Sequence, residues 1–209
     1  MHPGDAVLQA QFPVHAAPRF SPFVPMEEVG DRFVLTSWGL ALEIRRKWIH
    51  AVTPVHAGRL LRPIPFGDGP QPGVRLLCGT PPRSLEKRFI EQAREALPDE
   101  HAAWISWNEH TGQFRYRPVR IQSSSPSSIT YDIPEVEEGE HLVVDMHSHG
   151  LLAAGFSPQD ERDDHGALKV AVCYGNLDQE VPTTAAVVRC LGVSFPIEAM
   201  NIKGQANDA

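Results

Sequence analysis

Two histidines separated by one residue stand at the end of an apolar run, in the segment VVDMHSH at 143–149. Successive side chains of a strand point to opposite faces, so His147 and His149 are predicted to point the same way, with both imidazoles within reach of one ion. Unpaired rings would be costly at the end of a buried strand, and a metal ion is a partner that satisfies both. We therefore interpret the pair as two ligands of a metal site.

A third ligand is expected from SPQD at 157–160, which has the sequence of a helix start with proline at the first helical position and an acid in the first turn. A helix beginning there can carry Asp160 to the two histidines. Two neutral imidazoles and one carboxylate leave zinc one open position, as is typical of catalytic zinc. Asp163, Asp164 and His165 follow closely and are alternative ligands or partners of the ligands.

The spacing H-x-H, seven residues, S, two residues, D is the signature of the JAMM (JAB1/MPN/Mov34) metallopeptidases. His147, His149, Ser157 and Asp160 match it without a gap. The chain resembles this family over about residues 84–195. The resemblance implies a cytidine-deaminase-like fold, a Zn²⁺ ion held by the two histidines and the aspartate, and hydrolysis of a peptide or isopeptide bond with a zinc-activated water.

The family also carries a glutamate at the start of an upstream strand, after its first long helix. Here Glu100 follows a helix predicted over 84–97 and precedes the strand WISW at 104–107. Glu109 is the runner-up, but it falls in a predicted hairpin turn. The resemblance implies that Glu100 takes the proton of the water and returns it to the leaving amine. It also implies that Ser157 donates a hydrogen bond to the developing oxyanion.

The chain departs from the family pattern at two places beside these residues. The proline that usually follows the second histidine is Gly150 here, which loosens the loop that positions the next helix. The Cys-Gly pair usually found after the glutamate is Ala102-Ala103. Because both replacements are small residues, close packing of the strand is retained.

The elements that must position these residues alternate between strands and helices, which predicts an α/β domain with a mixed central sheet flanked by helices. The hairpin signal lies at 108–112, and the loops are a serine-rich stretch at 123–128 and an acidic stretch at 135–140. Beyond the helix at 84–97 and the strand WISW, the expected elements are strands at 141–149, 167–175 and 183–195 and a helix beginning at Ser157.

The N-terminal part differs in construction, because 12 of the 19 prolines precede residue 83. We expect an extended proline-rich arm over 1–30 and a small β-rich region over 31–82, with strands in 32–55 and 73–79. A JAMM/MPN domain is expected over 83–200 and a C-terminal tail over 201–209.

Composition restricts the class of protein. The 209 residues carry a net charge of −7, with 42% hydrophobic and 22% charged residues, which predicts a folded soluble protein that does not bind nucleic acid. No apolar run of about 18 residues indicates a membrane helix. The first residues lack the order of a signal peptide, so a cytoplasmic location is expected. Cys78, Cys173 and Cys190 are expected to be buried reduced thiols.

The leading hypothesis is a zinc-dependent peptidase whose substrate is a protein or peptide. The alternative is a non-catalytic MPN-type scaffold that binds a partner. A zinc nucleobase deaminase is disfavoured, because no P-C-x-x-C follows the histidines. The β-rich region joined to this motif also resembles the Mov34/MPN/PAD-1 proteins of bacterial PRTRC systems. That resemblance implies ubiquitin-like proteins and ThiF-like E1 enzymes as partners.

Overall fold

The chain folds as two compact units. The structure is a computed structural model that describes residues 2–56 and 61–197. Unit 1 contains the residues up to Leu77, and unit 2 is Cys78–Glu198. The tail expected over 201–209 lies outside the described residues.

Unit 1 is a β-sheet preceded by a short helix, α1 (Pro3–Gln11). Neighbouring strands are antiparallel, except that β1 and β2 are parallel. Ala17, Val34, Ala41 and Val52 form a buried cluster against which Phe23 and Trp38 pack. The strands, in the order in which they pair, are β1 (Val14–Ala16), β2 (Gly30–Thr36), β3 (Gly39–Arg45), β4 (Ile49–Pro54) and β5 (Gly73–Leu76). The expected β-rich N-terminal region is therefore present.

The extended arm expected over 1–30 is wrong in its first part, because helix α1 spans Pro3–Gln11. A proline at the first helical position lacks only an N–H that would have no intrahelical partner, so Pro3 is compatible with the helix. The His2 side chain accepts a hydrogen bond from Gly4 N and caps that end. No residue of α1 is buried, which is why the helix has no clear apolar period in the sequence.

Glu43 is a fully buried carboxylate inside unit 1. Its oxygens accept hydrogen bonds from Arg32 Nε at 2.6 Å and Met26 N at 2.8 Å, and His50 Nε2 lies 2.8 Å from Oε1. Burial alone raises the pKa of Glu43, but the hydrogen bonds from His50, Met26 and Arg32 outweigh it, so the pKa lies below its ordinary value. The Glu43 carboxylate is therefore ionised, and it links β3 to Arg32 of β2 and to His50 of β4.

Unit 2 is built on a six-stranded mixed sheet, as the sequence predicts. The parallel pair is β10–β11, and the other neighbours are antiparallel. In spatial order the strands are β13 (Val193–Pro196), β12 (Thr183–Cys190), β11 (Leu168–Gly175), β10 (Glu140–Ser148), β6 (Ala102–Asn108) and β7 (Phe114–Pro118). The parallel pair lies at the centre, so its strands are covered on both faces.

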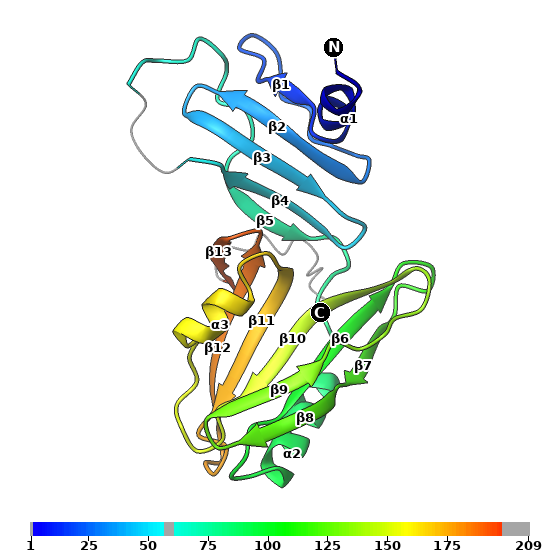
Figure 1. Cartoon of the computed structure of the whole chain (residues 1–209), viewed down its shortest axis with the longest axis vertical. Coiled ribbons are helices and arrows are strands. Elements are labelled where there is room, and N and C mark those ends of the chain that lie inside the picture. Colours follow the sequence, from blue (N-terminus) through cyan, green and yellow to red (C-terminus); the bar gives the residue numbers. More distant parts are fainter. Residues whose placement is uncertain (1, 57–60, 198–209) are drawn as a thin grey trace, which may run out of the picture. The chain divides into compact units, whose positions relative to one another are not determined.

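The two faces of this sheet carry different elements (Figure 1). Helix α2 (Arg83–Glu95) packs on one face, where the buried Phe89 ring lies 5.2 Å from the Tyr174 ring of β11. The short helix α3 (Pro158–Asp163) and a hairpin of β8 (Arg120–Ser125) and β9 (Ser128–Asp132) lie over the other face. A space between sheet, hairpin and α3 is thereby available for a functional site.

Two expectations for unit 2 are wrong in detail. The serine-rich stretch at 123–128 is not a loop but the end of hairpin β8–β9, in which Ser124 pairs with Ile129. The single strand expected over 183–195 is two strands, because Leu191 and Gly192 take positive φ angles and turn the chain. Cys173 and Cys190 are buried as expected, whereas Cys78 is half-buried.

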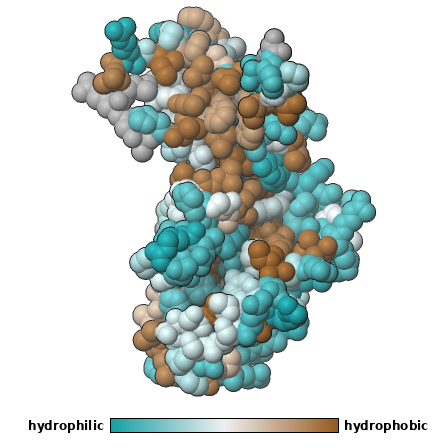
Figure 2. Space-filling view, in the orientation of Figure 1, coloured by the Kyte–Doolittle hydropathy of each residue, from teal (hydrophilic) through white to brown (hydrophobic). Residues whose placement is uncertain are grey.

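The surface also differs between the units. Figure 2 shows many hydrophobic side chains on the visible face of unit 1 and a more hydrophilic surface on unit 2. Within the described part of the chain, none of the helices combines the length and the apolar character needed to cross a membrane.

The stability of unit 1 is predicted to fall in acid because of Glu43. A carboxyl whose pKa is lowered in the folded state stabilises the fold above its unfolded pKa, and this stabilisation is lost as the pH falls through the folded value. We expect peptides from 30–54 to lose protection from hydrogen exchange below pH 5. Glu43→Gln should remove part of this pH dependence and destabilise unit 1 by about 3 kcal/mol at pH 7. Unchanged protection in Glu43→Gln would contradict this, and the exposed Glu27→Gln is the control.

Candidate metal centre

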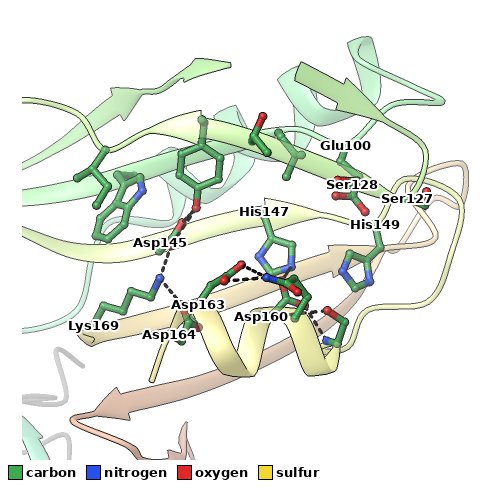
Figure 3. Close-up of a pocket in the computed structure, with 18 of the residues that line it drawn as sticks. Glu100, Ser127, Ser128, Asp145, His147, His149, Asp160, Asp163, Asp164 and Lys169 are labelled. Atoms are coloured by element: carbon green, nitrogen blue, oxygen red, sulfur yellow. Dashed lines mark hydrogen bonds and ion pairs between the residues drawn. The ribbon is translucent and has the colours of Figure 1, made fainter. Parts of the chain in front are cut away.

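A cavity of about 570 Å³ lies on unit 2 between hairpin β8–β9, strands β10 and β11, and helix α3. All five residues proposed from the sequence line it, although they come from three separate segments. They are Glu100, His147, His149, Ser157 and Asp160. Figure 3 shows the two imidazoles and the Asp160 carboxylate facing one another, with Glu100 on the opposite wall.

The two histidines point into this cavity because of the alternation of strand β10. Their ring centroids are 5.1 Å apart. Strand pairing with β11 continues beyond the end of β10, since His149 N donates to Tyr174 O at 2.8 Å. Both backbone positions are therefore fixed by the central parallel pair, and the imidazoles project from the rigid part of the sheet.

Asp160 is oriented by the start of helix α3. Ser157 N donates to Asp160 Oδ2 at 2.6 Å, and Asp160 N donates to Ser157 Oγ at 3.2 Å, which together form a capping box. The other carboxylate oxygen, Oδ1, lies 3.9 Å from His147 Nε2. The helix-start pattern and the metal-ligand pattern are thus compatible, because one oxygen caps the helix while the other faces the histidines.

The pKa values of His147 and Asp160 are both shifted in the direction that favours metal binding. Burial lowers the pKa of His147, which favours the neutral imidazole. Burial alone raises the pKa of Asp160, but the hydrogen bonds from the side chain and the backbone of Ser157, with a smaller effect of the neighbouring histidines, outweigh it and lower the pKa below its ordinary value. A neutral imidazole and an ionised carboxylate are both ready to bind a cation.

The Nε2 atom of His147 is in an environment that suits a metal ligand. This atom is buried and has no hydrogen-bond partner among the described residues. A buried polar nitrogen without a partner costs about 1–3 kcal/mol, so such atoms are rare unless a ligand or water satisfies them. The surroundings of His147 Nε2 therefore fit a bound divalent ion such as zinc.

Glu100 occupies the opposite wall and is held by its backbone. Glu100 N donates to Ser125 O at 3.0 Å, and Ser124 Oγ donates to Glu100 O at 2.5 Å, so hairpin β8–β9 fixes the residue. Its side chain is buried, and burial together with the nearby Asp160 charge raises the pKa of Glu100 to about 7. A carboxyl with such a pKa can exchange protons at neutral pH.

Cys173 is a potential ligand that the motif did not indicate. It pairs with His147 across β10 and β11, and its Sγ lies within 4.8 Å of donor atoms of both His147 and His149. The side chain is fully buried, and burial raises the pKa of its thiol to about 12. A parallel register places His147 and Cys173 side by side, but neither strand's sequence specifies that register.

The remaining candidates contact other side chains. Glu109 is absent from the residues that line the cavity, and its Oε2 lies 3.2 Å from His141 Nε2. The exposed Asp163 accepts hydrogen bonds from the side chain of Gln159 within its own helix. Asp164 forms ion pairs with Lys169 and Arg189, whereas His165 lines a separate small pocket. Asp163 and Asp164 also line the cavity, but their carboxylates are engaged by these other side chains, whereas Glu109 and His165 do not line it.

Gly150 has a conformation that explains its departure from the family pattern. Its φ is +53°, whereas the proline ring requires a φ near −65°. A Cβ at this position would also lie 2.9 Å from Pro98 O. The loop after His149 consequently follows a path that excludes proline.

We predict that restoring the family residue will destabilise this protein. Gly150→Ala should lower the free energy of unfolding by about 1–2 kcal/mol, the cost of a left-handed conformation for a residue with a Cβ. Gly150→Pro should cost more, because its ring cannot adopt the observed φ. Denaturant unfolding of the three proteins measures this order. A Gly150→Pro variant as stable as the wild type would show that the loop takes a different path.

Comparisons with known proteins identify the family. A domain of unknown function, DUF2016, matches residues 2–77, and the family described as prokaryotic homologs of the JAB domain matches residues 82–190. No curated protein matches the chain. The solution structure of protein DSY2949 from Desulfitobacterium hafniense is similar with 15% identity and a TM-score of 0.44, covering 59% of this chain and 91% of that chain. Because the JAB match covers more than half of the 209 residues, the chain belongs to the prokaryotic homologs of the JAB domain, within the JAMM/MPN family.

Proposed function

We propose that the protein is a zinc-dependent hydrolase that cleaves a peptide or isopeptide bond. The observation that carries the proposal is the shared cavity, which brings a carboxyl with a pKa of about 7 opposite two histidines and an ionised aspartate. His147, His149 and Asp160 would hold the metal. When bound, zinc supplies Lewis acidity and makes water a nucleophile at neutral pH. The catalytic domain is proposed to span 83–200.

Glu100 is the proposed general base and acid of this reaction. Its backbone hydrogen bonds to Ser124 and Ser125 hold it on the wall opposite the metal ligands. The ionised carboxylate takes the proton of the attacking water, and the resulting carboxylic acid gives that proton to the nitrogen of the leaving amine. A pKa near the working pH serves both steps, because neither protonation state is strongly disfavoured.

Ser157 is the proposed donor to the oxyanion that forms on the attacked carbonyl. Its Oγ accepts a hydrogen bond from Asp160 N, and its hydroxyl also interacts with the Asp160 carboxylate. In the proposed role the hydroxyl donates instead to the oxyanion in the cavity that Ser157 lines. One such donor is worth about 3 kcal/mol in comparable sites. The capping box thus serves two purposes, because it orients both the third ligand and this hydroxyl.

The proposed substrate is a conjugate or precursor of a ubiquitin-like protein. Support comes from the membership in the JAMM/MPN family, whose domains typically act on proteins. A ThiF-like E1 enzyme, a PRTRC-type gene context and a cytoplasmic location are parts of the same proposal. The alternative is a scaffold that binds a partner through the same domain and catalyses nothing.

We expect the wild type to bind one zinc ion per chain and to cleave ubiquitin-like proteins joined through their C-terminus to a reporter or a lysine peptide. Mass spectrometry of metal content and a cleavage assay measure the two properties separately. His147→Ala should lose both, because a ligand is missing. Glu100→Gln should keep the metal and lose about 10²- to 10⁴-fold in rate.

Glu109→Gln is the matched control, since it makes the same chemical change outside the cavity. It should keep both metal and activity. A wild type that binds zinc but cleaves none of these substrates would favour the scaffold. Full activity in Glu100→Gln would contradict the proposed role of Glu100.

A further inference from the structure

Helix α3 carries Asp160 but lacks the apolar contacts that usually hold a helix. It is only six residues long, and none of them is buried. A helix of this length is not stable alone, because helix nucleation is unfavourable and few hydrogen bonds follow. The capping box stabilises its first turn, and Asp160 Oδ1 lies 3.9 Å from His147 Nε2 on β10, which is beyond hydrogen-bond distance. Interactions elsewhere must therefore hold α3 against strands β11 and β12.

Two cations on the sheet provide these interactions. Asp164, the residue that caps the end of α3, pairs through Oδ1 with Lys169 Nζ at 2.5 Å and through Oδ2 with Arg189 Nε at 3.1 Å. Arg189 Nη1 also lies 2.8 Å from Glu161 Oε1. The side chains of Lys169, Asp164 and Arg189 are only 12%, 12% and 4% exposed. Pairs this well buried are weakly screened by solvent.

Lys169 also contacts the strand that carries the histidines. Its Nζ lies 2.6 Å from Asp145 Oδ2, and Asp145 precedes His147 by two residues on the same face of β10. Tyr131 of β9 donates to the same carboxylate at 2.9 Å. Figure 3 shows Lys169 between Asp145 and Asp164, with an interaction to each. One ammonium group therefore connects the strand of His147 with the helix of Asp160.

We propose that Lys169 is a positioning residue for the metal centre, holding Asp160 toward His147 through the Asp164–Lys169–Asp145 bridge. The inference rests on the proposed metal site and deepens it. Asp164 N donates to Asp160 O at 2.9 Å, so a shift of Asp164 moves the turn of Asp160 with it. Losing the bridge leaves α3 held by Arg189 alone and removes its link to β10, so part of the free energy of metal binding is spent on restoring the position of Asp160.

Lys169 lines the cavity, so a direct contact with substrate is the competing role. Both of its close partners are carboxylates of the protein, and the charge is compensated before any substrate enters. If Lys169 positions Asp160, substituting Lys169 lowers the affinity for metal even in the absence of substrate. If Lys169 instead binds substrate, the same substitution leaves the metal affinity unchanged and raises only KM.

The test is the zinc affinity of the full chain, measured by competition with a chelating dye for the wild type and Lys169→Met, Lys169→Arg and Asp164→Asn. We expect a loss of about 10- to 100-fold in Lys169→Met and Asp164→Asn, the usual effect of removing a partner of metal ligands. Lys169→Arg should recover part of the affinity, because it restores the charge between the two carboxylates. Arg120→Met, which breaks the exposed pair with Asp132, is the control and should bind zinc as the wild type does.

Hydrogen exchange of the metal-free proteins separates positioning from loss of the fold. Peptides covering 157–165 should exchange faster in Lys169→Met and Asp164→Asn, whereas those covering α2 should keep their protection. Wild-type zinc affinity in a folded Lys169→Met would overturn the positioning role alone. Failure of the wild type to bind zinc would overturn the metal site and this inference together. Equal loss of protection throughout unit 2 in both variants would also overturn it, since Lys169 would then support the whole fold.

Discussion

The alternation of side chains along strand β10 is the constraint on which the site depends. The strand lies inside the sheet, between β6 and β11, so its register is fixed on both sides. Met146 is buried on one face, whereas Asp145 and His147 line the cavity on the other. A shift of one residue would exchange the two sets and bury the imidazole among apolar side chains.

The two walls of the cavity are attached to this sheet by polar contacts. Hairpin β8–β9 is joined to it through Tyr131 and Asp145 and fixes the backbone of Glu100. Helix α3 is joined through Asp164 to the cations of β11 and β12. Buried polar contacts of this kind fix the position of the hairpin and of α3 on the sheet, because each carboxylate oxygen accepts a hydrogen bond from one defined donor. Glu100 and Asp160, which are proposed to act in catalysis and metal binding, are thus positioned by residues that have no proposed part in the reaction.

The alternation of strand and helix patterns predicted the mixed sheet, and the four motif residues were proposed from their spacing and its resemblance to the JAMM signature; both depend on local patterns. Strand alternation, the helix start at Ser157 and the turn near Gly112 are all encoded within a few residues. Hairpin β8–β9 was missed because serine has little preference for strands, and its strands are stabilised by distant contacts such as Ser124 Oγ to Glu100 O. Helix α1 was missed because it buries no residue and so has no apolar face.

The contacts of Lys169 and Cys173 could not be predicted for a related reason. Lys169 is 24 residues from Asp145 in sequence, and no spacing rule links an ion pair of that separation. Cys173 comes beside His147 only through the register of two parallel strands. Both residues therefore required the tertiary structure, although each lies in a strand that the sequence predicted.

The central claim is that His147, His149 and Asp160, and not Cys173, hold the metal. X-ray absorption of the zinc-loaded protein measures this most directly, because sulfur and the lighter ligands differ in distance and scattering. We expect only nitrogen and oxygen ligands at about 2.0–2.2 Å, including two imidazoles. A sulfur ligand at about 2.3 Å that disappears in Cys173→Ser would contradict the claim and assign the thiol as a ligand.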